Sequence, residues 1–493
     1  MPLEREDRAS HGWAWNLENA FMDDAALPAS PAPSSKSPPS PSQHASESSA
    51  PPSRRLRVEL FSRAILMGAM VGLLATAFRF TLECAEKFRV QVVPLLYDWG
   101  LGGWLLLLAG VGFLVWSAAE LVRRAAPESA GSGIPHIKAV LDHRAAFRSL
   151  RLIAVKFTSG LLGIGAGLAL GREGPTVQMG AALGIRVFDW WPPKKAPYRE
   201  AAIIGGGAAG ISAAFNSPLA GVTFALEEMQ VFASHSAFLA ALIASLVADT
   251  ISRFFLGELP VFQVSLEGRP GISSLPHCLF IGAVMAGLGI LYSHSLLNLV
   301  AFMKRVGRRG WWVLWGFVCL ALSLVLWIDP RVAGGGFAMT EAMFEGSMGW
   351  QVLSVVLAVR FVLSLASYGL ATAGGIFAPM LLLGGLAGMI LGQLAHLWQV
   401  PYAPEPLVWS LVAMAAFFSA VVRCPLTAIV LLVEMTGIYT LVLPLMCGAF
   451  MAAFAASLLG PPPIYDELLR RNYPGPAQGG SMQEELAEKA PAK

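Results

Sequence analysis

Apolar runs without a charged residue fill most of the chain between positions 64 and 465, and they restrict what it can fold into. About 20 apolar residues make one membrane-spanning helix, so the longest runs can each supply two. Of all 493 residues 55% are hydrophobic and 14% are charged, and the mean hydropathy is +0.59. We therefore predict an all-α, multi-pass membrane protein and not a soluble enzyme. The long runs cover residues 201–226, 270–303, 310–328, 361–404 and 435–465.

Other apolar runs are shorter than an ordinary span and contain glycine or proline. They cover residues 64–78, 157–171 and 424–433. Short runs with internal breaks are typical of tilted or discontinuous transmembrane helices. The chain also has 50 glycines, which indicates helices that pack closely against one another.

The two ends of the chain differ from its apolar centre. Residues 28–52 are almost entirely Pro, Ser and Ala, a composition that cannot bury a core, so we expect residues 1–53 to be disordered. Residues 54–472 are predicted to form one membrane domain. The remaining residues, 473–493, are too few for a folded regulatory domain.

Basic residues gather in three clusters beside the apolar runs. By the positive-inside rule these clusters face the cytoplasm, so we expect both termini to lie on the cytoplasmic side of the inner or plasma membrane. The net charge of +3 gives no indication of a nucleic-acid partner. The clusters are Arg54, Arg55, Arg57 and Arg63; Lys304, Arg305, Arg308 and Arg309; and Arg470 with Arg471.

Cysteine and histidine form no pattern of a metal or disulfide site. The cysteines are odd in number, lie in or beside apolar runs and include no CxxC, so we interpret them as buried thiols. The histidines show no ligand spacing, and we predict neither a metal nor a cofactor. An intramembrane enzyme would need a nucleophile–base or metal constellation, and none has plausible spacing. The cysteines are Cys84, Cys278, Cys319, Cys424 and Cys447.

Glu173 is the most informative single residue, because it lies in Gly171-Arg172-Glu173-Gly174-Pro175 between two apolar segments. An ionisable side chain at membrane depth is costly and is a functional hypothesis by default. The glycines and the proline should break a helix there and leave backbone N–H groups free beside the carboxylate. We predict an anion path gated by a protonatable carboxylate. The alternative is an ordinary first-turn glutamate favoured by the helix dipole.

An internal repeat relates the two halves of the domain, roughly residues 54–257 and 270–472. Glycines follow Pro175 and Pro379 at +5 and +9 in both halves, and a glutamate follows Pro218 and Pro425 at +9. The alternative is chance, since Gly and Pro recur in any protein with broken membrane helices. A two-fold repeat of broken helices places a binding site near the midplane, between the halves. The landmark residues are Gly180, Gly184, Gly384, Gly388, Glu227 and Glu434.

Two further glycine-rich breaks fit an anion site. The segment from Gly374 to Pro379 is the repeat partner of the Glu173 segment, and each should present a positive helix end. Two such ends would bind an anion through partial charges alone. A full positive charge at this place would hold the anion too tightly to release it. Gly131-Ser132-Gly133-Ile134-Pro135 is the third break. Ser132 can donate its hydroxyl to an anion or, alternatively, cap the following helix.

Two glutamates and a tyrosine end apolar runs. Glu227 has a repeat partner in Glu434, which favours a structural role for that pair, whereas Met435 stands where Glu228 would have one. Glu228 is therefore the better candidate for a function needed on one side, such as proton uptake. Tyr465 follows three prolines, and from the residues alone it is an aromatic-belt tyrosine.

The motifs together resemble the signature segments of the CLC family of chloride channels and proton–chloride exchangers. The resemblance runs in family order from about Arg57 to Arg471. It implies an α-helical fold of about eighteen tilted and broken segments in two inverted halves, and a homodimer with one pore per subunit. The segments that carry it are 131–135, 171–175, 215–221, 374–379 and 423–427.

The resemblance also implies roles for individual residues. Glu173 would be the external gate and proton acceptor, and Glu228 the internal proton-transfer group. Chloride would be bound by the hydroxyls of Ser132 and Tyr465 and by the backbone N–H groups of Ile376 and Phe377. The supporting residues would be Gly131, Gly133, Pro135, Arg172, Gly174, Pro175 and Gly375.

Single positions distinguish branches of that family. The nitrate-preferring branch has proline where Ser132 stands, the fluoride branch departs from the Ser132 and Tyr465 pattern, and family channels commonly have valine at the Glu228 position. All three positions favour exchange of chloride for protons, with a passive gated chloride channel as the alternative. The regulatory domain pair of many eukaryotic relatives is not expected.

Overall fold

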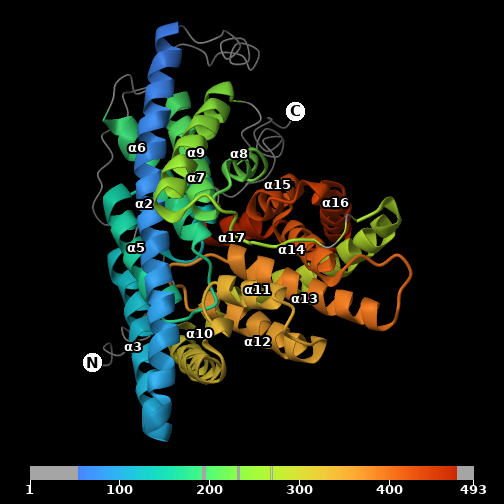
Figure 1. Cartoon of the computed structure of the whole chain (residues 1–493). Helices are drawn as coiled ribbons and strands as arrows, with labels where there is room; N and C mark the ends of the chain where they lie inside the picture. Colours follow the sequence, from blue (N-terminus) through green and yellow to red (C-terminus); the bar gives the residue numbers. More distant parts are fainter. Residues whose placement is uncertain (1–53, 191–195, 230–233, 267, 269, 475–493) are drawn as a thin grey trace, which may run out of the picture.

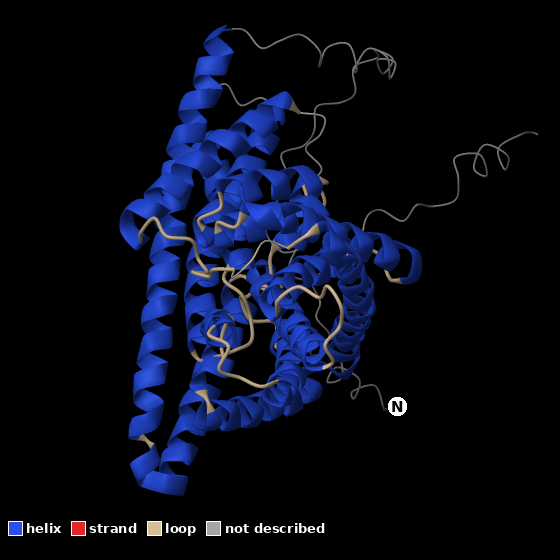
Figure 2. Cartoon of the chain, turned by 45° about the vertical axis from the view of Figure 1, so that its right-hand side comes forward, coloured by secondary structure: helices blue, strands red, loops and turns tan. Residues whose placement is uncertain are grey.

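The computed structural model describes residues 54–190, 196–229, 234–266, 268 and 270–474. Regular structure in these residues is helical (Figure 2), apart from two isolated β-bridges. This confirms the predicted all-α class. Residues 1–53, for which we expect disorder, lie outside the described residues, and so do residues 475–493 of the tail.

The helices follow one another with short connections. Six segments in the described residues are long and apolar enough to cross a membrane, and several shorter apolar helices lie between them. The α-helices are α2 (Arg54–Leu95), α3 (Gly100–Ala125), α4 (Ile134–Leu141), α5 (Ser149–Gly165), α6 (Glu173–Asp189), α7 (Ala196–Phe215), α8 (Pro218–Glu227), α9 (His235–Leu256), α10 (Leu275–Ile328), α11 (Phe337–Phe344), α12 (Trp350–Gly369), α13 (Phe377–Leu397), α14 (Pro406–Val422), α15 (Pro425–Thr436), α16 (Val442–Leu459) and α17 (Ile464–Asn472).

The two halves of the chain occupy different sides of the molecule. In Figure 1, α2 runs along one side as a single long helix with α3 and α5 beside it, whereas α13 to α16 lie on the opposite side. The short helix α17 returns to the middle and packs on α4, so the end of the second half contacts the first.

Equivalent positions of the two halves share unusual backbone angles. Gly100, between α2 and α3, has φ 50° and ψ −127°, and Gly307, which breaks α10 into two helices, has φ 59° and ψ −143°. Asn216 and Arg423 both adopt the left-handed conformation two residues before the proline that begins α8 or α15. Non-glycine residues rarely adopt a positive φ. Its recurrence at matched places confirms the internal repeat that the Gly and Pro spacing predicts.

The landmark glycines of the repeat allow two helix pairs to touch backbone to backbone. A Cβ at Gly180 would lie 2.2 Å from the carbonyl oxygen of Gly206 in α7. A Cβ at Gly388 would lie 2.4 Å from that of Trp409 in α14. Only glycine permits such an approach, and small residues at helix interfaces are what membrane packing favours. α6 is therefore held against α7, and α13 against α14, in the same way.

The cysteines only partly match their predicted burial. Cys278, Cys319 and Cys424 are buried, but Cys84 on α2 is exposed and Cys447 on α16 is half-buried. The prediction was wrong for these two, because an apolar run in a membrane protein can turn a small residue toward lipid as readily as toward the core.

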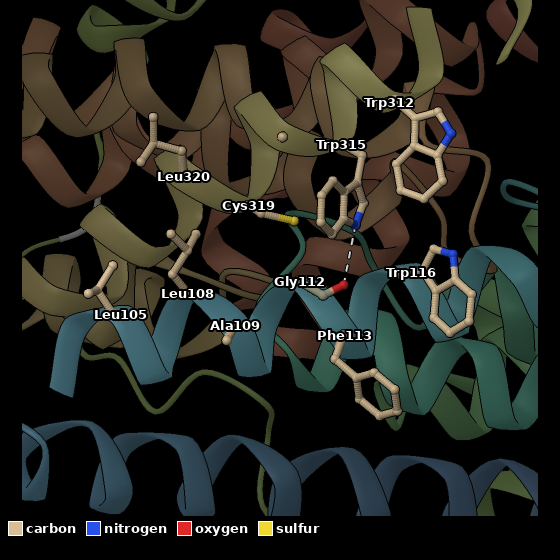
Figure 3. Close-up of a pocket in the computed structure, with 11 residues that line it drawn as sticks. Leu105, Leu108, Ala109, Gly112, Phe113, Trp116, Trp312, Trp315, Cys319 and Leu320 are labelled. Atoms are coloured by element: carbon tan, nitrogen blue, oxygen red, sulfur yellow. Dashed lines mark hydrogen bonds between the residues drawn. The ribbon is translucent and has the colours of Figure 1, made fainter. Parts of the chain in front are cut away.

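A groove of about 650 Å³ lies between α3 and the second helix of α10. Figure 3 shows Trp312 and Trp315 facing Gly112 and Trp116 across it, and the Trp315 indole donates a hydrogen bond to the Gly112 carbonyl over 3.3 Å. Its lining is almost entirely apolar and includes none of the residues predicted to bind an ion. It belongs to the outer face of the helix pair and not to the candidate site.

Candidate functional site

Backbone hydrogen bonds join the three predicted breaks into one structure. Gly171 and Gly375 exchange two of them, at 2.7 and 2.8 Å, as an antiparallel bridge. Gly131 donates to Thr372 over 2.9 Å and accepts from Gly374 over 3.1 Å. Segments about 200 residues apart in the chain therefore meet at the start of α4, α6 and α13.

The Glu173 carboxylate lies at the N-terminus of the repeat-partner helix. Its Oε2 accepts a hydrogen bond from the backbone N–H of Ala378 over 3.3 Å, and the residue is fully buried. Its Oε1 has no hydrogen-bond partner among the described residues. A Cβ at Gly171 would lie 2.1 Å from Oε2, so only glycine leaves room for the carboxylate there. Glu173 thus lies where an anion would be attracted by the positive end of α13.

Ser132 and Tyr465 present two buried hydroxyls that have no hydrogen-bond partner among the described residues. The Tyr368 hydroxyl lies next to Ser132, and Tyr465 lies within electrostatic reach of Tyr368 and Glu173. Buried hydroxyls are normally bonded, so an unpaired one calls for an explanation such as a bound ion. Ser132 does not cap α4, because Gly133 is the cap and no side-chain bond is made there. Tyr465 is fully buried, which is unlike an aromatic-belt residue.

Ile376 and Phe377 begin α13, as cap and first helical residue. Phe377 is buried and packs on Phe215 and Phe418, with ring centroids 5.1 and 4.4 Å apart. The first N–H groups of a helix have no partner within the helix, so this end can donate to an anion.

The other supporting residues shape the breaks around the site. A Cβ at Gly174 would lie 2.6 Å from the Ser132 carbonyl oxygen, and one at Gly375 would lie 3.0 Å from the Gly174 nitrogen. Gly131 and Gly133 have φ values of 63° and 83°, which glycine adopts without strain. Pro135 and Pro175 lie in the first turns of α4 and α6, where a missing N–H costs nothing.

Arg172 extends away from Glu173 toward another charged group. Its Nη1 lies 3.3 Å from Glu83, and its guanidinium carbon lies 4.4 Å from the centre of the Phe337 ring. The residue is only 7% exposed. Arg172 therefore ties the start of α6 to α2 and α11 and adds positive charge next to the gate region.

Glu228 is buried in a cluster of charged groups that the sequence analysis did not identify. Lys138 on α4 donates to Glu228 Oε1 over 2.8 Å and also bonds Asp466 on α17. The Cys424 thiol donates to Glu228 Oε2 over 3.3 Å. The Glu228 side chain is 3% exposed and that of Asp466 is 40% exposed. With all three groups ionised the cluster carries one net negative charge, so it can take up one proton and become neutral.

Glu227 and Glu434 make mirror-image contacts. The Glu227 carboxylate accepts the backbone N–H groups of Leu426 and Thr427 over 2.9 and 2.7 Å, at the start of α15. Glu434 accepts those of Leu219 and Ala220 over 3.2 and 2.9 Å, at the start of α8. Each helix therefore caps the other. The structural role predicted for this pair is confirmed.

Lys156 is a second charged residue that the sequence analysis missed. It is fully buried on α5, and its Nζ donates to the carbonyls of Ser129 and Gly131 over 2.9 and 2.7 Å. A single lysine inside an apolar run was the signal that could have revealed it. Lys138 gave no such signal, because its partners lie 90 and 328 residues away in the chain.

Comparison with known proteins agrees with the fold and with these motifs. Residues 111–457 match the model of a family described as voltage gated chloride channel, which is more than half of the chain. The chain belongs to the CLC family. The matched region contains Ser132, Glu173, Glu228 and the start of α13.

Curated relatives in the CLC family are about one-third identical. The H(+)/Cl(-) exchange transporter ClcA of Vibrio cholerae serotype O1 is 34% identical over 413 residues, which are 83% of this chain and 88% of that protein. ClcA of Citrobacter koseri is 34% identical over 83% of this chain and 87% of its own.

Solved CLC structures share the architecture. A slow cyanobacterial Cl-/H+ antiporter is 30% identical, has a TM-score of 0.80 and covers 84% of this chain and 98% of its own. A CLC-type fluoride/proton antiporter, at 23% identity and a TM-score of 0.70 over 85% of this chain and 99% of its own, shares the fold. The protein is a multi-pass membrane protein with a CLC-type fold.

Proposed function

We propose that this protein is a secondary transporter that exchanges chloride for protons across the membrane. The observation that carries the proposal is the Glu173 carboxylate at the N-terminus of α13, where an anion would also bind. A carboxylate that competes with chloride for one helix end leaves when it is protonated, because its attraction to the N–H groups falls. Chloride binding and proton binding are then coupled at one place. The relatives named as exchange transporters support the same reaction.

Ser132, Tyr465, Ile376 and Phe377 form the central chloride site in this proposal. The support is the pair of buried hydroxyls with no partner among the described residues, together with the free end of α13. Chloride would accept these hydroxyl and amide donors, which bind without a full positive charge. Arg172 holds the gate region through Glu83 and Phe337.

Glu228 supplies protons from the other side. Its cluster with Lys138 and Asp466 reaches the surface through the Asp466 side chain. Taking up one proton neutralises the single net negative charge of the cluster. A passive chloride channel of the same fold is the alternative, and it would have no use for a second buried carboxylate. Among the residues that the structure describes, no catalytic constellation supports an enzyme.

Topology and assembly complete the proposal. Lys304 donates to the carbonyl of Arg471 and to the Asn472 side chain, so two of the predicted basic clusters lie on one side of the molecule. By the positive-inside rule that side is cytoplasmic, in the inner or plasma membrane, and both termini face it. The protein would be a homodimer in the bilayer, as the family resemblance implies.

The test is proton movement in liposomes that contain only the purified protein. An inward chloride gradient should drive protons outward against their own gradient, with a fixed ratio of chloride to protons. A membrane voltage that responds to chloride alone, with no proton movement, would establish the channel alternative instead. Chemical crosslinking of the protein in the same liposomes measures the dimer.

A further inference from the structure

The loop before α11 is the repeat partner of the Ser132 loop before α4. Gly334 and Gly336 have φ values of 75° and 102°, as Gly131 and Gly133 have 63° and 83°. Each loop leads into a helix of 8 residues. Gly335 therefore occupies the place that Ser132 has in the first half.

A buried cation binds each loop in the same way. Lys156 Nζ donates to Ser129 and Gly131, and Arg360 Nη1 donates to the carbonyls of Val332 and Gly334 over 3.0 and 2.8 Å. Lys156 lies on α5 and Arg360 on α12, which hold the same position in the two halves. The clamp is thus part of the repeat and stabilises both loops.

Arg360 differs from Lys156 because it has a second arm. Its Nη2 has no hydrogen-bond partner among the described residues, although the residue is only 1% exposed. Nη2 lies 3.1 Å from where a Cβ of Gly336 would be, beside the Leu382 side chain at 2.8 Å, so it points at the start of α11. The N–H groups of that helix end lack partners within the helix. Arg360 Nη2 and the first backbone N–H groups of α11 are therefore neighbouring hydrogen-bond donors that lack an acceptor, and an anion could supply one.

The loop is partly accessible, and four arginines lie around it. Gly335 and Phe337 are half-buried, and the Arg172 guanidinium lies over the Phe337 ring. The halves are inverted, so this loop faces the membrane side opposite to the Ser132 loop. The neighbouring charged side chains are four arginines, Arg79, Arg89, Arg172 and Arg360, and four carboxylates, Glu83, Glu86, Glu341 and Glu345.

We propose that the N-terminus of α11 and Arg360 Nη2 form a second halide site, on the outer side of Glu173. This inference rests on the proposed chloride transport and extends it. A chloride ion held there would wait next to Arg172 until Glu173 leaves the end of α13. The site would set the affinity for external chloride, whereas the Ser132 and Tyr465 hydroxyls hold the central ion.

The first test replaces Arg360 with Lys. Lys156 shows that a lysine can make the same two-carbonyl clamp, so R360K removes only the free arm. The external chloride concentration for half-maximal exchange should rise roughly tenfold, because a charge-assisted donor is lost. The chloride-to-proton ratio should stay unchanged. The control is R331K, which alters an arginine paired with Asp329 at the surface near the same loop. Equal external affinities in R360K and wild type would overturn the site.

The second test restores a hydroxyl to the loop. Gly335 has no positive φ, and the nearest atom to a Cβ there is 3.6 Å away, so a small side chain fits. G335S should bind external chloride severalfold more tightly than G335A, which has the added carbon without the hydroxyl. Identical affinities in these two variants would count against the site.

The third test observes the ion directly, by anomalous diffraction from crystals of the whole protein soaked in bromide. We expect one peak between Ser132 and Tyr465 and another at the start of α11, with the second peak lost in R360K. A peak at Ser132 alone in the wild type would overturn this inference and leave the proposed function intact. Absence of both peaks would overturn the proposed anion transport as well.

Discussion

Glu227 and Glu228 are neighbours in the chain, yet the repeat treats them differently. Glu227 has a partner in Glu434, and the two carboxylates cap each other's helices with nearly the same bonds. Glu228 has Met435 at the matching place and bonds instead to Lys138 and Cys424. What the halves share holds the fold together. What they do not share can act on one side of the membrane only.

The same contrast holds at the glycine loops. The clamps of Lys156 and Arg360 are alike. In the second half, however, Gly335 occupies the position equivalent to Ser132, and Phe377 the position equivalent to Glu173. A gate on one side and a proton route on the other require the two sides to differ chemically, even when the backbone does not. Substitutions at paired and unpaired positions should therefore have different consequences.

Replacing Glu173 with Gln should have the largest effect. The amide resembles the protonated acid, so it should leave the end of α13 open to chloride, but it carries no proton. Proton movement should fall to background while chloride flux continues, as measured by simultaneous chloride and pH electrodes outside liposomes. Proton pumping by the mutant would refute the gate assignment.

Replacing Glu228 with Gln should come next. Proton transport should stop because the inner route is interrupted, and chloride should still move because Glu173 remains. The matched control is E227Q, one residue earlier, which should keep the wild-type ratio of chloride to protons. If E228Q keeps that ratio, protons enter elsewhere and the asymmetry at Met435 has another cause.

Replacing Asp466 with Asn should have an intermediate effect. The cluster then loses its exposed carboxylate, and Lys138 balances the charge of Glu228 alone. Because the net negative charge that attracts a proton is gone, proton delivery should slow severalfold, while the ratio of chloride to protons is kept. The measurement is the exchange rate as a function of pH on the cytoplasmic side. D142N, at the end of the same helix α4 but paired with Arg144, is the control. An identical pH profile in D466N and wild type would exclude Asp466 from the route.

Replacing Glu227 or Glu434 with Gln should have the smallest effect on transport. Each variant weakens two charge-assisted bonds to helix N–H groups, so each should lower stability by about 1–3 kcal/mol. The loss should be somewhat larger for Glu227, because its carboxylate also accepts the Thr427 hydroxyl over 2.6 Å. Thermal unfolding in detergent compares them. A large loss of coupling in either variant would show that the paired positions also carry function.

Much of the fold and part of the site could be predicted from the sequence. The Gly and Pro spacing indicated the internal repeat, and the matched positions of Gly180 and Gly388 proved to be the places where helix backbones touch. The missing partner of Glu228 set it apart from Glu227 before any contact was known. These signals can be recognised in the sequence, because each is a spacing within one short segment that recurs in the other half.

The charged neighbours could not be predicted, because they are brought together only by the fold. Lys138 meets Asp466 because α17 packs on α4, and nothing in either segment indicates that contact. The Gly334–Gly336 loop was also overlooked, since it lacks the serine that made its partner noticeable. Cys84 lies among the charged residues Glu83, Glu86 and Lys87, and its exposure depends on which face of α2 is turned outward.

The reciprocal capping of α8 and α15 has a consequence for biosynthesis. Ala220 donates its N–H to a carboxylate 214 residues further along the chain, so this acceptor does not yet exist when the first half leaves the ribosome. Until Glu434 has been synthesised and inserted, the start of α8 must rely on lipid headgroups, water or the insertion machinery for hydrogen bonds. The last step of assembly is therefore shared, and neither half reaches its final structure before the other.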